Sequence, residues 1–210
     1  GQIYDSNGPM LHALLLELGI SSITVAHCTD DYTATGQTLA RLTATHDFII
    51  IAGGVSVGEH DQIKPALQQL GLAPDLWRVK LKPGKPFLFS HRLQPAPLYV
   101  FGLPGNPVSS FVTFQLFVRP ALLRWLGASP DEVRPPVVSA RLAQSIANPG
   151  DRPHYVRGRL ANGKFSAQGM QQSHAIFGLS QANALLRLDE GEAAEAGSIR
   201  EMILLQQSPH

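Results

Sequence analysis

The sequence predicts an α/β domain followed by a small all-β barrel, and three observations support this division. Up to about residue 127, helical and strand patterns alternate, which is typical of βαβ units with a mostly parallel sheet. Residues 128–136 form a polar linker that contains several prolines. Short runs of alternating polar and apolar residues follow, as in a barrel or a sandwich. We expect domains at residues 1–130 and 131–210.

The elements of the α/β domain follow from hydrophobic periodicity and from the residues that begin or end each element. Helical spacing predicts helices over residues 9–18, 35–45, 61–70 and 108–126. Apolar runs predict strands over residues 23–26, 47–52, 77–82, 87–90 and 98–103. The run 47–52 is apolar almost throughout, so we expect a central strand there. Pro120 should kink the last helix.

The second domain is predicted to consist of short strands joined by turns. Strands are expected over residues 137–142, 154–160, 164–168, 184–188 and 198–205. Asn162-Gly163 separates two of them, and this dipeptide favours a type I′ hairpin turn.

Composition narrows the classes of function. The chain has 210 residues, of which 17 are Lys or Arg and 16 are Asp or Glu, so a broad nucleic-acid or membrane surface is not expected. No apolar run has membrane-spanning length, and no signal-peptide pattern is present. A single cysteine, Cys28, excludes an internal disulfide and favours the cytoplasm; we expect it to be buried. The chain begins with Gly1 and not with Met, so we interpret the chain as a fragment of a longer protein.

A basic loop is the most informative feature of the sequence. Four cations fall within eight residues of a chain whose net charge is +1: Arg78, Lys80, Lys82 and Lys85. If residues 77–82 form a strand, the first three cations project together, opposite Trp77, and the turn at Gly84 returns Lys85 to their side. Such crowding predicts a bound anion. The alternative is an edge strand whose lysines prevent edge-to-edge pairing.

A glycine-rich loop, residues 53–61, follows the strand predicted at 47–52 and precedes a helix. Ligands of open α/β sheets bind at this position, and glycines allow backbone N–H groups to approach a phosphate. Asp61 ends the loop. Its carboxylate either caps the following helix or binds a divalent metal that bridges to the phosphate.

Three further loops are predicted at the same edge of the sheet. Asp30-Asp31 is either a magnesium-binding pair or a helix cap. Tyr4-Asp-Ser-Asn7 and Leu103-Pro-Gly-Asn-Pro107 each lead into a helix, and Asn106 offers a donor and an acceptor. Together with the basic loop, these segments predict a composite site for a phosphorylated ligand and a metal.

The second domain offers weaker candidates. Arg157 and Arg159 share one face of a predicted strand and are able to hold an oxyanion, although a solvated barrel face is the simpler interpretation. The histidines lack zinc-site spacing, and His154 and His174 are expected on the surface or in packing. No Gly-x-Ser-x-Gly elbow is present.

Taken together, these motifs resemble the molybdopterin molybdenumtransferases, the MoeA and gephyrin E-domain family. The resemblance rests on Tyr4-Asp-Ser-Asn7, Gly53-Gly-Val-Ser-Val-Gly-Glu-His-Asp61, Lys82-Pro-Gly-Lys-Pro86 and Leu103-Pro-Gly-Asn-Pro107. It implies a MogA-like domain that binds molybdopterin, followed by the family's C-terminal barrel. The N-terminal domains of the family are absent here.

The resemblance implies that the protein inserts molybdate into adenylylated molybdopterin with release of AMP, with Mg²⁺ required. It implies a catalytic set of Asp30, Asp61, Lys82 and Lys85, in which the two aspartates hold the metal. It implies molybdate contacts by Lys82, Lys85, Pro86, Arg157 and Ser173. It implies substrate contacts by Ser6, Asn7, Gly53, Gly54, Ser56, Arg78, Gly105, Asn106 and Pro107.

The resemblance also implies a homodimer in the longer protein and a partner enzyme, the molybdopterin adenylyltransferase of the same pathway. Two alternatives stay open. One is that adenylyltransferase activity itself, although such enzymes lack the second domain and the Lys-Pro-Gly-Lys-Pro loop. The other is a non-catalytic scaffold domain, as in gephyrin.

Overall fold

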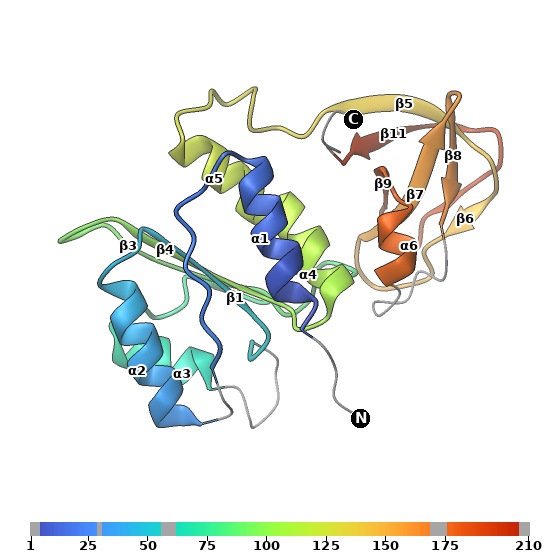
Figure 1. Cartoon of the computed structure of the whole chain (residues 1–210). Coiled ribbons are helices and arrows are strands. Elements are labelled where there is room, and N and C mark those ends of the chain that lie inside the picture. Colours follow the sequence, from blue (N-terminus) through green and yellow to red (C-terminus); the bar gives the residue numbers. More distant parts are fainter. Residues whose placement is uncertain (1–4, 29–30, 56–61, 169–175, 206–210) are drawn as a thin grey trace. The chain divides into compact units, whose positions relative to one another are not determined.

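The computed structural model describes residues 5–28, 31–55, 62–168 and 176–205, and it divides the chain into two compact units (Figure 1). The first unit contains Gly1–Val79 and Gly84–Ser110. The second contains Lys80–Pro83 and Phe111–His210. The tip of the basic loop therefore groups with the second unit, while the chain on either side of it belongs to the first. The domain boundary expected near residue 130 stays a prediction.

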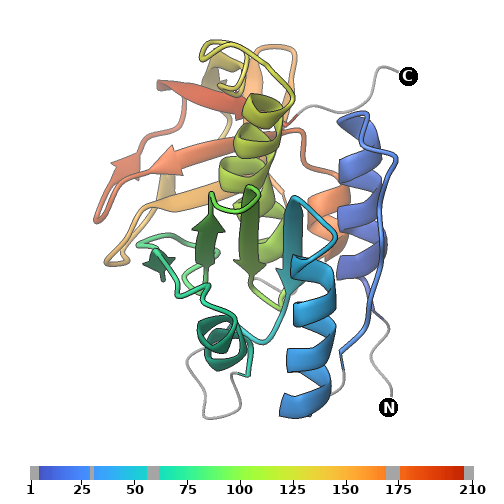
Figure 2. The same ribbon diagram turned by 90° about the vertical axis from the view of Figure 1, so that its left-hand side faces the viewer.

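The first unit contains a four-stranded sheet in the order β1-β4-β3-β2 (Figure 2). The strands are β1 (Phe48–Ala52), β2 (Leu76–Trp77), β3 (Leu88–Arg92) and β4 (Leu98–Leu103). β1 pairs with β4 in parallel, whereas β3 is antiparallel to both β4 and β2. The α/β class is confirmed, but the expectation of a mostly parallel sheet is not.

Two helices, α2 (Tyr32–Thr43) and α3 (Ile63–Gln69), cover one face of this sheet, and α1 (Asn7–Glu17) lies on the other side in Figure 1. Leu39 of α2 and Leu67 of α3 pack with Leu88 and Val100 of the strands in one buried core. Because an apolar helix stripe has to be covered, this core fixes the loops that connect helices and strands.

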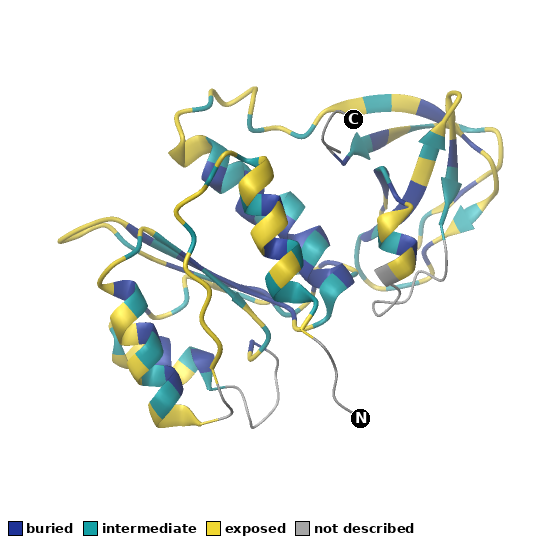
Figure 3. Ribbon diagram, viewed as in Figure 1, coloured by how far each residue is buried: buried dark blue, intermediate teal, exposed yellow. Residues whose placement is uncertain are grey.

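The segment expected as a strand at residues 23–26 has no regular structure, and most residues between Ser21 and Cys28 are exposed (Figure 3). Among the described residues, β1 consequently has a strand neighbour on one side only, which is β4. The expectation that residues 47–52 form a central strand is therefore wrong. Cys28 is exposed, so the prediction of a buried thiol is also wrong.

The long helix predicted at residues 108–126 consists of three segments. They are α4 (Pro107–Thr113), a π-helical segment η1 (Phe114–Val118) and α5 (Arg119–Trp125). Pro120 is the second residue of α5 and is separated from the π-helical segment by Arg119 alone. Proline has no N–H to donate, and the wider helix just before it accommodates this missing hydrogen bond within a continuous helical stretch.

The second unit contains a closed barrel with strand order β11-β5-β8-β7-β9, which confirms the predicted barrel. Its strands are β5 (Val137–Leu142), β7 (His154–Ala161), β8 (Lys164–Ala167), β9 (Ala184–Leu188) and β11 (Ile199–Leu204). A short pair, β6 (Ile146–Ala147) and β10 (Ala193–Ala194), and the helix α6 (Ile176–Ser180) complete the unit.

The barrel interior is filled by alternate side chains of its strands. Val156, Phe165, Leu186 and Met202 are buried together there. Asn162 and Gly163 join β7 to β8 with φ angles of 50° and 71°, as the predicted type I′ turn requires. Within the described residues, no helix is both long and apolar enough to cross a membrane.

Candidate functional site

Three loops of the first unit converge, as the sequence predicted for the edge of the sheet. The Asn7 Nδ2 group donates a 2.8 Å hydrogen bond to the carbonyl oxygen of Gly105. The Gly53 N–H donates a 3.0 Å hydrogen bond to the carbonyl oxygen of Leu103. A Cβ atom on Gly105 would lie 3.4 Å from the Gly53 Cα atom, so these two backbones approach closely. The loops that begin α1, follow β1 and follow β4 therefore form one assembly.

The first loop is held by Asp5. Its Oδ1 atom accepts hydrogen bonds of 3.0 Å from the backbone N–H groups of Asn7 and Gly8. This Asx-type arrangement satisfies two N–H groups at the start of α1. Ser6 occupies the N-cap position, but its side chain makes no capping hydrogen bond. The Ser6 hydroxyl is therefore not used to begin the helix.

The third loop is held by Asn106, whose side chain begins α4. The Asn106 Oδ1 atom accepts hydrogen bonds from the N–H groups of Val108 at 3.1 Å and Ser109 at 3.4 Å. Pro107 takes the first helical position, where its missing N–H is harmless. The Asn106 Oδ1 atom, which was a candidate acceptor for a ligand, is thus used to cap α4. The Asn106 side chain would therefore offer a ligand its N–H donors.

The glycines after β1 have conformational reasons to be glycine. Gly53 has a φ of 90° and Gly54 a φ of 66°, both in the left-handed region that side chains disfavour. A Cβ atom on Gly54 would also lie 2.9 Å from the Cγ1 atom of Ile63. These glycines shape the loop whether or not a phosphate approaches it. Ser56 and Asp61, predicted further along this loop, lie outside the described residues.

The acidic pair Asp30-Asp31 was predicted to be either a magnesium-binding pair or a helix cap, and the structure shows the cap for Asp31. The Asp31 Oδ1 atom accepts a 2.6 Å hydrogen bond from the Ala34 N–H, so Asp31 caps α2. Asp30 lies outside the described residues. Within the part of the chain that the structure describes, no three His, Cys, Asp or Glu side chains group closely enough to hold a metal ion.

The basic loop differs from the predicted strand. The strand ends at Trp77, because Arg78 has a φ of 69° and leaves the extended conformation. The Arg78 guanidinium lies over the Trp77 ring, 4.2 Å from its centroid. The predicted arrangement, with the cations on one strand face and Trp77 on the other, is therefore wrong. Antiparallel contacts continue nonetheless, since the Val79 N–H donates to the Lys85 carbonyl oxygen at 3.1 Å.

Lys80 and Lys82 both make contacts within the second unit. The Lys80 Nζ atom lies 2.6 Å from the Glu190 carboxylate, which raises the Lys80 pKa by hydrogen bonding and charge attraction. The Lys82 N–H donates to the Pro153 carbonyl oxygen at 2.9 Å, and the Lys82 carbonyl oxygen accepts from the Tyr155 N–H at 2.8 Å. The Lys82 backbone thus extends the barrel beside the start of β7, and its side chain is exposed.

His154 lies at this junction and was not predicted as a site residue. Its side chain is 6% exposed. Burial, and then the positive charges of Lys82 and Arg157, lower the His154 pKa to about 4, so the ring is neutral at neutral pH. The second unit therefore brings Lys82 and Arg157 to the same histidine. No local pattern in the sequence places residue 82 beside residue 154. The sequence therefore contains no signal that His154 is buried next to these cations.

The remaining predicted residues are placed as follows. Arg157 is 1% exposed on β7, and burial lowers its pKa. Lys85 belongs to the first unit with an exposed side chain, and Pro86 is half-buried. Ser173 lies outside the described residues.

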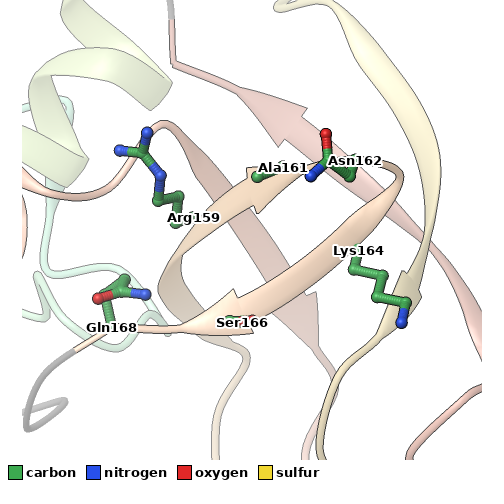
Figure 4. Close-up of a pocket in the computed structure, with 6 residues that line it drawn as sticks. All are labelled: Arg159, Ala161, Asn162, Lys164, Ser166 and Gln168. Atoms are coloured by element: carbon green, nitrogen blue, oxygen red, sulfur yellow. The ribbon is translucent and has the colours of Figure 1, made fainter.

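A polar hollow of about 510 Å³ lies on the β7–β8 hairpin (Figure 4). Its lining includes Arg159 and Lys164, together with Ala161, Asn162, Ser166 and Gln168. In Figure 4, the Arg159 and Lys164 side chains point to different sides of the hairpin, so they do not meet at one point. Arg157 is buried while Arg159 is exposed, so the simpler interpretation, a solvated barrel face for both arginines, is wrong for Arg157.

Comparison with known proteins matches two families to successive parts of the chain. Residues 1–124 match the family described as "Probable molybdopterin binding domain", and residues 139–205 match the "MoeA C-terminal region (domain IV)". The chain belongs to the MoeA and gephyrin family. The resemblance that its loop motifs indicated is therefore confirmed.

Two curated relatives and one solved structure illustrate the match. A molybdopterin molybdenumtransferase of Nostoc sp. is 36% identical over 98% of this chain and 48% of its own length. The molybdenum cofactor synthesis protein cinnamon of Drosophila melanogaster is 35% identical over 95% of this chain and 34% of its own length. A crystal structure of the molybdopterin biosynthesis MoeA protein from Pyrococcus horikosii gives a TM-score of 0.81 at 26% identity, covering 98% of this chain and 49% of that one. The chain thus spans half or less of the length of each of these three proteins.

Proposed function

We propose that this chain is the catalytic part of a molybdopterin molybdenumtransferase, which inserts molybdate into adenylylated molybdopterin with release of AMP. The observation that carries this proposal is the closed barrel that follows the α/β unit and matches the MoeA C-terminal region. The rival adenylyltransferases share the α/β domain but lack this second domain. A non-catalytic scaffold remains the second rival, and catalytic turnover separates it from the enzyme.

The converging loops of the first unit are proposed to bind the phosphate that the pterin part of the substrate carries. Asn7, Gly53 and Gly105 are joined by the hydrogen bond and close approach described above, and backbone N–H groups in such loops favour phosphate. The residues proposed for substrate binding are Ser6, Asn7, Gly53, Gly54, Ser56, Arg78, Gly105, Asn106 and Pro107. Asn106 would contribute its amide donor, because its oxygen caps α4.

Molybdate, the inorganic substrate, is proposed to bind to Lys82, Lys85, Pro86, Arg157 and Ser173. The charges of Lys82 and Arg157 act together on His154, which supports a shared oxyanion site in the second unit. A neutral His154 adds no third positive charge beside Lys82 and Arg157, and charge-assisted hydrogen bonds from these two cations would bind the oxyanion. Lys82 and Lys85 would each stabilise the negative charge of molybdate.

Mg²⁺ is the proposed metal, held by Asp30 and Asp61. Carboxylate oxygens are the donors that Mg²⁺ prefers in phosphate sites, so the chemistry of this pair fits the ion. When bound, Mg²⁺ would neutralise charge on the phosphoanhydride that links AMP to the pterin. The catalytic set proposed for this chain is Asp30, Asp61, Lys82 and Lys85. No covalent nucleophile is needed.

The cellular setting is also a proposal. We place the protein in the cytoplasm, because family membership assigns it to molybdenum cofactor biosynthesis and its single cysteine suits a reducing compartment. The longer protein would act as a homodimer and receive adenylylated molybdopterin from the adenylyltransferase of the pathway.

The proposal is tested by measuring molybdate-dependent AMP release from adenylylated molybdopterin with the full-length protein. Lys85→Ala and Asp61→Ala should each reduce turnover about a hundredfold or more, as loss of a charge-stabilising group does in other enzymes. Lys164→Ala, which removes an exposed lysine of the barrel hairpin, is the matched control and should retain activity. Normal turnover in both site variants would refute the assignment. AMP formation that requires ATP and free molybdopterin instead would identify the adenylyltransferase.

A further inference from the structure

Two cationic side chains contact the indole ring of Trp77. The Lys64 Nζ atom lies 3.6 Å from the ring centroid, and the Arg78 Cζ atom lies 4.2 Å from it. Trp77 itself is half-buried and packs against the core of the first unit, so the ring is a fixed support. A cation on an indole is attracted by about 0.5–1 kcal/mol at an exposed site, and the ring therefore favours both contacts.

The backbone contributes to this arrangement. Arg78 is a non-glycine residue with a φ of 69°, which costs of order 1 kcal/mol and is often found at functional sites. This conformation turns the Arg78 side chain back over Trp77, where an extended strand would have directed it to the opposite face. Lys64 comes from α3, on a different part of the chain. Two separate elements thus bring positive charge to one ring.

The two charges are close enough to repel each other. Because both lie within 4.2 Å of the same ring centre, they are at most about 8 Å apart, which is no more than one Debye length at physiological ionic strength. Within the described residues, neither side chain forms an ion pair. The nearby Asp75 carboxylate is occupied by His91, at 2.8 Å from its Nδ1 atom. A bound anion would relieve this repulsion.

A phosphate group fits the spacing. Charge-assisted hydrogen bonds to an oxyanion are about 2.8 Å long, so two cations at most about 8 Å apart can reach oxygens of the same phosphate or of linked phosphates. The Arg78 fork and the Lys64 point charge are the two donor types that proteins use for phosphate. The Trp77 Nε1–H is buried and makes no hydrogen bond to a described residue, so the two cations are the donors that the ring offers to an anion.

We propose that Lys64 and Arg78, both supported by Trp77, form a phosphate-binding site of the first unit, with Lys64 as a binding residue beyond those considered above. Its identification as the site of the substrate's phosphate rests on the proposed function. The binding site itself rests on the geometry of the three side chains.

The test uses the fluorescence of Trp77 in the 210-residue chain. The sequence has two tryptophans, so Trp125→Phe leaves Trp77 as the single reporter. AMP and inorganic pyrophosphate are titrated separately, and saturable changes of Trp77 emission are expected. Lys64→Gln and Arg78→Gln should each weaken binding about tenfold or more, as expected for loss of one charged hydrogen bond. Lys64→Arg keeps the charge and should restore most of the affinity.

Arg41→Gln is the matched control, because Arg41 is an exposed cation of α2 in the same unit. It should leave the affinity unchanged. Equal affinity in the parent and both site variants, an equal loss in Arg41→Gln, or no response of Trp77 to either anion would overturn the inference. Phosphate binding that depends on Lys64, in a full-length protein without transferase activity, would refute the proposed function alone. Normal phosphate binding by Lys64→Gln in an active transferase would refute this inference alone.

Discussion

The Asn7 side chain donates a hydrogen bond to the Gly105 carbonyl oxygen across 98 positions of the chain. Asn7 is the first residue of α1, and Gly105 lies just before α4. One amide therefore couples the starts of two helices and fixes the distance between two of the predicted binding loops. Backbone atoms of both loops are held in place before any ligand arrives, which reduces the entropy lost on binding.

Removal of this amide should weaken both stability and binding. Asn7→Ala is expected to lower the free energy of unfolding by about 1 kcal/mol, the net value of one hydrogen bond. Asn7→Asp should cost more, because a carboxylate oxygen would then face the Gly105 carbonyl oxygen. Urea unfolding measures both changes, and Gln69→Ala on the exposed side of α3 provides the control. Equal stability of Asn7→Asp and the parent would contradict the donor role of Asn7.

Gly54→Ala should be more damaging than Gly19→Ala, although both glycines have positive φ angles of 66° and 78°. Backbone strain of about 1–2 kcal/mol applies to both variants. At Gly54, the new Cβ atom would also approach Ile63 to 2.9 Å, whereas Gly19 has nothing within 4 Å. Overpacking should therefore add about 1–3 kcal/mol at Gly54 alone. Denaturant unfolding of the two variants measures this difference, and an equal loss would show that Ile63 moves aside freely.

His154 should make the barrel unit sensitive to acid. Its pKa of about 4 in the folded state lies below the ordinary histidine value of 6.5, so the unfolded chain binds the proton more tightly. Stability contributed by the neutral ring is present above pH 6.5 and is lost as the pH falls towards 4. The full effect is at most about 3 kcal/mol. Unfolding free energies measured from pH 7 to pH 4 should fall less steeply for His154→Phe, and parallel curves would contradict the prediction.

The Lys80–Glu190 ion pair should contribute little to stability. Both side chains are largely exposed, so water and dissolved ions screen their attraction strongly. A double-mutant cycle with Lys80→Ala and Glu190→Ala should give a small coupling energy that disappears in high salt. A large coupling energy that resists salt would show that the pair anchors the loop to the barrel.

Local patterns predicted most of the elements. The strands at residues 98–103, 137–142 and 184–188 have the predicted bounds, because apolar alternation and flanking turn residues determine them locally. The failures depend on distant partners. Residues 23–26 have strand-forming composition, but a strand needs a neighbour to pair with. The predicted strand at 77–82 ends early because its tip, Lys80–Pro83, pairs with the barrel instead.

The candidate site likewise has features that the sequence predicted and features that depend on distant residues. The three loops of the first unit were predicted to meet, because the carboxyl ends of strands gather at one edge of a sheet, and Asn7, Gly53 and Gly105 do meet. The burial of His154 beside Lys82 and the support of Lys64 by Trp77 were not predictable. Each joins residues from separate elements, and no periodicity or motif in a single sequence encodes such a contact.

The open side of β1 has a consequence for handling the chain. Phe48–Ala52 is an apolar strand, and among the described residues it pairs with β4 alone, so the backbone donors and acceptors of its other side pair with no described strand. It carries no charged residue, proline or bulge of the kind that natural sheets use to discourage contact between molecules. At high concentration, molecules of the 210-residue chain are therefore expected to associate by pairing β1 of one molecule with β1 of another. Association of this kind would grow with protein concentration and would raise the light scattering of the sample before either unit unfolds.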